Sequence, residues 1–137
     1  MEKRNYEDIK VGEKKSFGKT ITEADIYAFC GITGDFNPMH VDEVFASQTR
    51  FKGRIAHGML VAGLVDQTLT AVVGQGGIHV SQQVAFKTPV KIGDTITVLS
   101  EITEKIEDKR RIMITSTWTN QDGVTVMTGK SECLLPR

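Results

Sequence analysis

The sequence predicts an α+β fold in which a mostly antiparallel sheet wraps around a long central helix. The chain has 137 residues, which is the usual size of one domain. Residues 58–73 form the long apolar stretch with helical length, and four segments with strand-like alternation follow it. An antiparallel sheet can bury one face on such a helix and leave its other face polar, which accounts for this alternation.

The part of the chain before this helix is predicted to begin with a strand and a capped helix. After a polar lead-in, residues 15–21 favour a first strand. Thr22 is typical of a helix N-cap, and the acidic residues that follow it suit a first helical turn. Apolar residues at helical spacing continue to Cys30, and we expect Gly31 and Gly34 to weaken this helix and to end it.

Residues 35–40 are predicted to be a stiff loop. Pro38 has no N–H to donate, and its ring keeps Asn37 out of the helical region. A short helix over residues 42–48 and an irregular basic connection over residues 49–56 then lead to the long helix. A loop of this kind suits a site whose groups must be held in a fixed geometry.

The long helix spans about 24 Å if residues 58–73 are fully helical. Its first half, MLVAGLV, is apolar on every side, which predicts burial all round. Gly63 costs about 1 kcal/mol of helix propensity relative to alanine, and such a cost favours a second backbone packed close to it. We expect Gly74, Gly76 and Gly77 to end the helix.

The remaining residues read as strands. Val80, Val84 and Phe86 alternate with small or polar residues, and Pro89 ends this run. Residues 121–123, with the sequence Gln-Asp-Gly, are typical of a hairpin turn. The three later strands are expected over residues 95–106, 111–119 and 124–135.

The composition excludes several classes of function. Seventeen basic residues balance seventeen acidic ones, so nothing favours nucleic acid or an anionic membrane as a partner. The first fifteen residues lack the apolar run of a signal peptide, and residues 59–73 are too short and too polar to span a bilayer. Cys30 and Cys133 lie far apart in apolar segments, so we expect reduced core cysteines and a cytoplasmic protein. No Cys/His ligand spacing is present, so no metal site is expected.

Three polar residues close together mark the candidate site. Asp35, Asn37 and His40 fall within six positions, and a helix start at His57-Gly58 follows them. A carboxylate and an imidazole can act together on one water, and a helix start offers unpaired N–H groups to an anion. Each residue also has a structural alternative: Asp35 and Asn37 suit turns, His40 suits a buried structural role, and His57 suits a helix cap.

These residues also carry a resemblance to a known family. Residues 32–42, ITGDFNPMHVD, resemble the hydratase-2 motif of the MaoC-like hydratases, which include the (R)-specific enoyl-CoA hydratases. Residues 54–60 resemble the start of the central helix in that family, and residues 85–94 resemble a later strand and turn. Members are single-domain hot-dog proteins of about this length. The resemblance therefore implies one MaoC-like hot-dog domain over residues 1–137.

The resemblance implies roles for particular residues. Asp35 and His40 would be the catalytic pair, and Asn37 would help to hold the water or the pair. The backbone N–H of Gly58 would be the oxyanion donor to the thioester carbonyl. The residues next to these are the candidates for substrate binding: Met39, His57 and Met59. The family commonly forms homodimers whose sheets join edge to edge, with acyl-CoA near the interface, and no metal or other cofactor is implied.

The predicted function is reversible hydration of trans-2-enoyl-CoA to (3R)-hydroxyacyl-CoA. Three alternatives stay open at this point: an acyl-CoA thioesterase on the same scaffold, a (3R)-hydroxyacyl-ACP dehydratase, and a non-catalytic module that binds acyl thioesters. The basic residues Arg50, Lys52 and Arg54 precede the central helix. They suit either a solvated face or contact with the phosphates of CoA.

Overall fold

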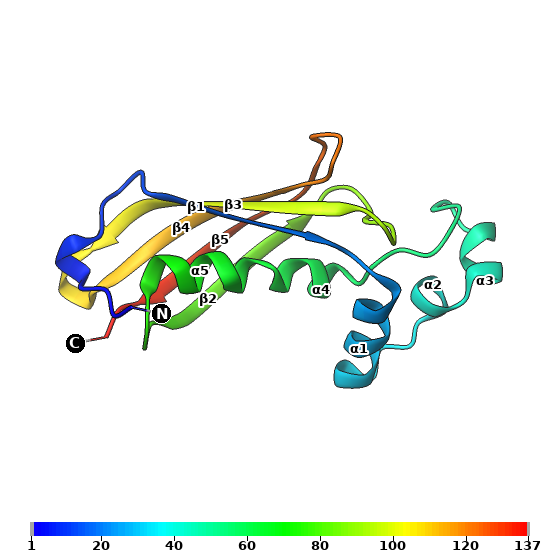
Figure 1. Ribbon diagram of the computed structural model, residues 1–137, viewed down its shortest axis with the longest axis horizontal. Helices are drawn as coiled ribbons and strands as arrows, with labels where there is room; N and C mark the ends of the chain where they lie inside the picture. Colours follow the sequence, from blue (N-terminus) through cyan, green and yellow to red (C-terminus); the bar gives the residue numbers. More distant parts are fainter. Residues whose placement is uncertain (1, 137) are drawn as a thin grey trace.

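The computed structural model describes residues 2–136, which form a five-stranded sheet with helices on one face and beyond one end (Figure 1). The strands are β1 (Lys14–Thr20), β2 (Ile78–Phe86), β3 (Thr95–Ile106), β4 (Arg111–Thr119) and β5 (Thr125–Leu134). The helices are α1 (Glu23–Thr33), α2 (Pro38–Val41), α3 (Glu43–Gln48), α4 (Gly58–Gly63) and α5 (Val65–Val73). Two 3-10 turns, η1 (Tyr6–Asp8) and η2 (Glu107–Lys109), complete the described elements. Four strands, β1, β3, β4 and β5, lie within one residue of their predicted bounds.

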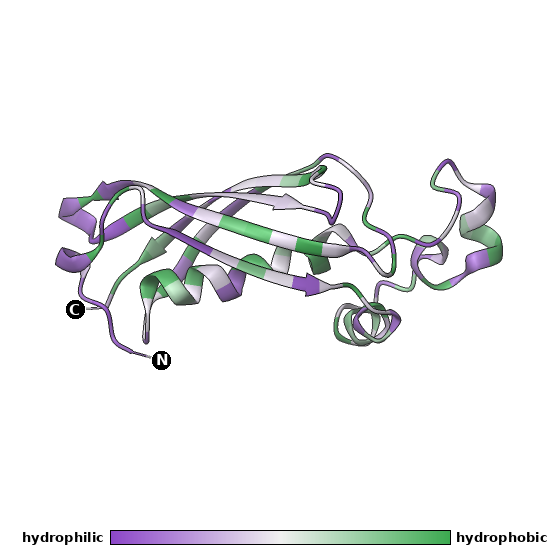
Figure 2. Ribbon diagram, turned by 45° about the horizontal axis from the view of Figure 1, so that its top comes forward, coloured by the Kyte–Doolittle hydropathy of each residue, from purple (hydrophilic) through white to green (hydrophobic). Residues whose placement is uncertain are grey.

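The sheet is antiparallel throughout and has the strand order β1-β3-β4-β5-β2. Every second residue of β4 is buried, and β3 shows the same alternation over its first eight residues. The buried side chains of these two strands form the centre of the core: Ile96, Val98, Ile102, Ile112, Ile114 and Trp118. Figure 2 shows this alternation of hydrophobic and hydrophilic segments along the strands. Helices α4 and α5 lie along the sheet (Figure 1), as the predicted α+β arrangement requires.

The predicted continuous helix over residues 58–73 is wrong, because the helix is interrupted at Leu64. The carbonyl of Val61 accepts the Leu64 N–H at 3.2 Å and the indole N–H of Trp118 at 3.0 Å. In a regular α-helix this carbonyl accepts from the residue four positions later. The buried Trp118 therefore donates to a carbonyl oxygen that a regular helix would use for its own hydrogen bond. This contact fixes where α4 ends on the sheet.

The expected burial of this helix on every side is also wrong. Met59 exposes 61% of its surface, and Gly63 is exposed. A Cβ atom built at Gly63 meets nothing within 4 Å, so the expected close backbone contact there is absent among the described residues. Because α4 packs on one face of the sheet, its apolar side chains contact the core on one side only.

The segment between β1 and α4 lies beyond one end of the sheet (Figure 1). Helix α1 begins with the predicted Thr22 cap, completed as a capping box by Asp25. It continues through Gly31, contrary to the expectation that this glycine helps to end it, and it ends at Gly34 with φ 76°. The predicted loop over residues 35–40 is partly wrong, because α2 begins at Pro38. Proline at the first helical position loses no hydrogen bond, and Asn37 before it stays outside the helical region, as predicted.

The two cysteines are free and buried, as predicted. Burial raises the pKa of the Cys133 thiol to about 12, and the carboxylates of Asp66 and Glu132 add to this shift. Cys30 lies in α1 against the site described below. No helix within residues 2–136 combines the length and the apolar character needed to cross a membrane.

A chain of buried hydroxyl groups joins α5 to the sheet. Thr68 Oγ1 donates to the Val65 carbonyl at 2.7 Å, so Ser100 Oγ, also at 2.7 Å, must donate to Thr68. Ser116 Oγ lies 2.7 Å from Ser100 and continues the chain into β4. All three hydroxyl residues are fully buried. Because each hydroxyl hydrogen has an acceptor, the chain satisfies these polar groups inside an apolar core.

We expect Thr68→Val to lower the free energy of unfolding by about 1–3 kcal/mol, because it leaves the Ser100 hydroxyl buried without an acceptor. Thr70→Val, the same change at a half-buried position of the same helix, is the control and should cost less than about 0.5 kcal/mol. Urea unfolding at one fixed protein concentration measures both values. Equal costs for the two variants would show that the hydroxyl chain contributes nothing.

Candidate active site

His40 lies in α2 and exposes 7% of its surface. Its Nδ1 lies 2.7 Å from the carbonyl oxygen of Ile55. A carbonyl can only accept, so Nδ1 carries the hydrogen of the neutral ring and Nε2 carries the lone pair. Nε2 lies 4.0 Å from Oδ2 of Asp35. The Ile55 contact therefore orients the basic nitrogen of His40 toward the carboxylate.

Asp35 follows the left-handed Gly34 that ends α1. Its Oδ1 accepts the backbone N–H of Asn37 at 3.1 Å, which leaves Oδ2 on the side of His40. The side chain is half exposed, and the 4.0 Å to His40 Nε2 is too long for a direct hydrogen bond. The predicted pair is thus brought together, with a gap between its two polar atoms.

His57 lies beside this pair and occupies the N-cap position of α4. Its side chain makes no cap hydrogen bond in α4. Instead, Nε2 donates to the backbone carbonyl of Asp35 at 3.0 Å, and the ring stacks on His40 with the ring centres 3.8 Å apart. Sγ of Cys30 lies 3.6 Å from the same nitrogen. His57 therefore contacts both predicted catalytic residues.

Asn37 has a local structural contact. Its Oδ1 accepts the N–H of Met39 at 3.1 Å and so caps the helical turn that carries His40. Among the described residues, those that line the cavity do not include Asn37. The side chain thus sets the start of α2, the turn that carries His40.

Gly58 begins α4 and faces the same space. The first hydrogen bond of the helix runs from the Val61 N–H to the His57 carbonyl at 3.2 Å, so the Gly58 N–H precedes the helical ladder. A Cβ atom at Gly58 would lie 2.5 Å from Cε1 of Phe86. Glycine therefore lets the Phe86 ring pack directly on the backbone that carries this N–H.

A cavity of about 600 Å³ connects these groups. Asp35, His40, His57 and Gly58 all contribute to its wall. Most of the remaining wall is apolar and includes Phe29, Met39, Ile55, Met59, Phe86, Val90, Val126 and Met127. The candidate substrate-binding residues Met39, His57 and Met59 thus all lie on the cavity. A wall of this composition suits an apolar chain with its polar end at the Asp35–His40 pair.

Sequence reasoning missed two aromatic residues of the cavity. Phe29 packs its ring 4.8 Å from the His57 ring, although its helical spacing indicated only a core position. Phe86 is 58% exposed at the end of the edge strand β2 and lies against Gly58. An aromatic residue at the exposed end of an edge strand was the available signal for Phe86.

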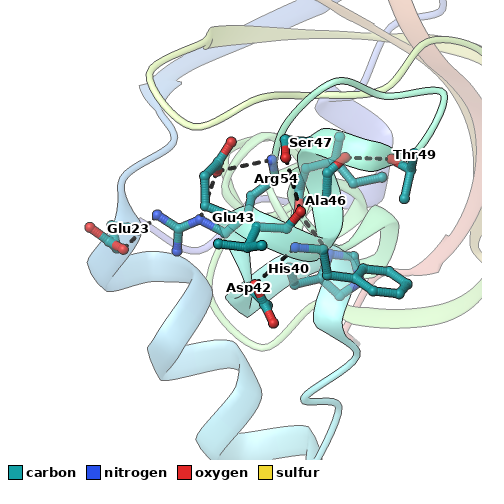
Figure 3. A network of polar contacts seen from close by, with 11 residues as sticks. Glu23, His40, Asp42, Glu43, Ala46, Ser47, Thr49 and Arg54 are labelled. Atoms are coloured by element: carbon teal, nitrogen blue, oxygen red, sulfur yellow. Dashed lines mark hydrogen bonds and ion pairs between the residues drawn. The ribbon is translucent and has the colours of Figure 1, made fainter.

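The three basic residues before α4 divide between different roles. Arg54 binds Glu23 at 2.7 Å and Glu43 at 3.2 Å, and Figure 3 shows its guanidinium between these carboxylates. The hydrogen bond to Glu23 raises the pKa of Arg54 despite its burial, and Glu43 adds to this effect. Arg54 therefore ties α1 to α3. Arg50 lines the cavity, whereas Lys52 is exposed and lies outside its lining.

Asp35, His40 and His57 are also the one described group of acidic and histidine residues close enough to consider as metal ligands. One potential ligand atom from each lies within 4.8 Å of the others. However, the ring planes of the two stacked histidines are inclined by only 30° with centres 3.8 Å apart, so an ion at bonding distance cannot lie close to both planes at once. Each ring also already uses one nitrogen on a carbonyl. The arrangement does not fit an ion held by all three.

Comparison with known proteins agrees with this geometry. A sequence model of the MaoC-like domain family matches residues 7–123. This chain belongs to the MaoC-like family. The MaoC-like protein is 44% identical over 132 residues to an (R)-specific enoyl-CoA hydratase of Rhodospirillum rubrum, a match that covers 96% of this chain and 91% of that relative. It is 39% identical to a 3-hydroxybutyryl-CoA dehydratase of Methylorubrum extorquens, with 96% and 84% covered.

A solved structure resembles the MaoC-like protein closely. It is an (R)-hydratase of Aeromonas caviae, described as involved in PHA biosynthesis. The TM-score is 0.90 at 37% identity, and the match covers 94% of this chain and 98% of that one. These comparisons confirm the predicted family, the predicted hot-dog fold and the predicted enzyme class, the hydro-lyases.

The two hydrogen bonds to carbonyls predict opposite tautomers for the two stacked histidines. His40 should be the Nδ1–H tautomer when neutral, because Ile55 accepts from Nδ1, and His57 should be the Nε2–H tautomer, because Asp35 accepts from Nε2. Long-range ¹H–¹⁵N correlation spectra of the neutral rings distinguish the two forms. The same tautomer in both rings would contradict the hydrogen bonding described above.

Proposed function

We propose that this protein reversibly hydrates trans-2-enoyl-CoA thioesters to (3R)-hydroxyacyl-CoA. One observation carries the proposal: Asp35 Oδ2 and His40 Nε2 lie 4.0 Å apart on the wall of a largely apolar cavity that the Gly58 backbone also lines. A carboxylate, a ring nitrogen with a lone pair and a backbone N–H are the three groups that this reaction needs. The named activities of the relatives support the same class of substrate.

In the proposed mechanism one water lies between the two catalytic residues. An oxygen atom about 2.8 Å from both polar atoms can occupy a gap of 4.0 Å, and each of its hydrogens then has one acceptor. Asp35 takes one proton as the water oxygen bonds to Cβ, and His40 holds the other hydrogen and orients the water. The proton on Asp35 then passes to Cα, which completes the addition. Positioned acid–base groups of this kind each accelerate a reaction by roughly 10²–10⁴-fold.

In the proposed mechanism, the N–H of Gly58 stabilises the negative charge that develops on the thioester oxygen. This group stands at the start of α4 and has no side chain of its own to block the cavity. A donor already in place for the charged oxygen contributes about 3–4 kcal/mol to stabilising the transition state. The acyl chain would lie along the apolar wall, and the carbonyl would lie between Gly58 and the Asp35–His40 pair.

Other parts of the proposal concern the partner and the compartment. A second copy of the chain is the expected partner, joined at the edge strand β2, whose outer edge is unpaired within the described sheet and which exposes Ile78 and Val80. The two free cysteines suit the reducing cytoplasm. Among the residues that line the cavity, Arg50 and Lys87 carry positive charge and suit the phosphates of CoA.

The alternative functions predict different outcomes when the same substrates are added. A thioesterase releases free thiol, hydration consumes the conjugated enoyl chromophore without releasing thiol, and a binding module changes neither. A dehydratase for acyl carrier protein would act on the carrier-bound acyl group in preference to the CoA ester. The relatives favour hydration, because those at 37–44% identity are named as hydratases or as a dehydratase.

We expect Asp35→Asn and His40→Gln each to lower kcat by about 10²–10⁴-fold while the protein stays folded. The measurement follows loss of the enoyl absorbance over a chain-length series of trans-2-enoyl-CoAs, with a thiol reagent in parallel and chiral analysis of the product. Asp42→Asn and His79→Gln are matched controls, since Asp42 caps α3 and His79 lies on β2 outside the cavity. Normal rates in either site variant, or release of thiol, would contradict the proposal.

We expect Gly58→Ala to lower kcat/KM by about 100-fold, because the new methyl would lie 2.5 Å from the Phe86 ring and must displace either the ring or the N–H. Gly63→Ala, at a position with open space around it, is the control and should retain activity. Removing the obstructing ring in a Gly58→Ala, Phe86→Ala double variant should recover part of the loss. Full activity of Gly58→Ala alone would contradict the expectation that the methyl displaces the N–H.

A further inference from the structure

We infer that His57 is a positioning residue that sets the distance between the Asp35 carboxylate and the His40 ring. This inference rests on the proposed function, because it concerns the same pair of residues. His57 contacts the backbone of Asp35 and the ring of His40. It also immediately precedes the proposed oxyanion donor, Gly58. It thus lies where the three parts of the site meet.

The first contact holds the Asp35 end of the site. Asp35 is in a connection between α1 and α2, and its carboxylate is half exposed. The hydrogen bond of 3.0 Å from His57 Nε2 to the Asp35 carbonyl fixes the backbone from which this carboxylate projects. The Asn37 N–H then orients the carboxylate through Oδ1. Without the His57 donor, the backbone at Asp35 loses its contact with the chain that leads into α4.

The second contact holds the His40 ring. The hydrogen bond to Ile55 fixes one nitrogen of this ring. The His57 ring, 3.8 Å away and inclined by 30°, covers one face of His40 and limits the rotation of its ring. The two contacts together determine the direction in which Nε2 points.

The remaining nitrogen of His57 argues against a purely structural role. Nδ1 is buried and has no hydrogen-bond partner among the described residues, and the whole residue is only 3% exposed. A buried polar atom without a partner lowers stability, and structural histidines are usually satisfied at both nitrogens. An apolar ring of similar size would avoid this cost. The structure therefore retains at position 57 a group that is unfavourable for folding and suited to ordering the site.

Two substitutions separate the two contacts. His57→Gln retains an N–H donor near the position of Nε2 but removes the stacked ring, and His57→Phe retains the ring but removes the donor. We expect each to lower kcat by about 10- to 100-fold with little change in KM, because a misplacement of this pair by about 1 Å acts on the chemical step. We expect His57→Phe to have a melting temperature no lower than that of the unsubstituted protein.

A double-mutant cycle with His40→Gln tests whether His57 acts through the catalytic pair. If it does, adding His57→Gln to the His40→Gln variant should lower the residual rate by less than about 3-fold, because the group being positioned is already absent. The full 10- to 100-fold loss in the His40→Gln background would overturn the inference, as would normal kcat in both single variants. Asp122→Asn, in the exposed turn between β4 and β5, serves as the control in the same background.

A second measurement does not depend on turnover. In ¹H–¹⁵N spectra, the ring signals of His40 should shift in His57→Gln, which removes the stack, and should stay near their original positions in His57→Phe. Unchanged His40 signals in His57→Gln would overturn the inference. Absence of enoyl-CoA hydration by the unsubstituted protein would instead overturn the proposed function, and the spectra would still decide the role of His57. If His57→Gln does not fold, an Nδ1–H tautomer of His57 in the unsubstituted protein overturns the inference and the Nε2–H tautomer supports it.

Discussion

The packing of the α4–α5 segment on one face of the sheet is the constraint on which the rest of the structure depends. The sheet has one apolar face, and the buried residues of β3, β4 and α5 form the core against it. Trp118 reaches from β4 to the Val61 carbonyl and fixes the position of α4 along the sheet. Because Gly58 is the first residue of α4, the same contact determines where its N–H lies in the cavity.

The site lies at one end of this core, beside the segment of α1, α2 and α3 that extends beyond the sheet (Figure 1). Here hydrogen bonds from side chains to backbone carbonyls hold the chain in addition to apolar packing. His40 binds the Ile55 carbonyl, and His57 binds the Asp35 carbonyl, so the connections before and after α2 and α3 are joined to each other. The ion pairs of Arg54 add a further link between α1 and α3 on the outer side (Figure 3). These contacts place the Asp35–His40 pair and the start of α4 on the wall of one cavity.

Several positions in the site are suboptimal for folding alone. The carboxylate of Asp35 and Nε2 of His40 lie close without bonding to each other, and Nδ1 of His57 is buried without a partner. Gly58 has less helix propensity than alanine at the same position. Such departures from the best local choice are expected where a protein binds and reacts rather than where it packs. The hydroxyl chain of Thr68, Ser100 and Ser116 shows the opposite case, since every hydrogen there has an acceptor.

The sequence alone determined the elements and the candidate residues, because these follow from short-range rules. Alternation along 95–106 and 111–119 predicted those strands at their observed bounds, and the Thr22 and Gly34 signals predicted both ends of α1. Only the tertiary structure decided the break at Leu64, since its cause is a hydrogen bond from Trp118, 57 residues away from Val61. It also decided that His57 turns to Asp35 and His40 rather than making a cap hydrogen bond in α4. Contacts between residues far apart in the chain leave no periodic pattern, so local rules do not reveal them.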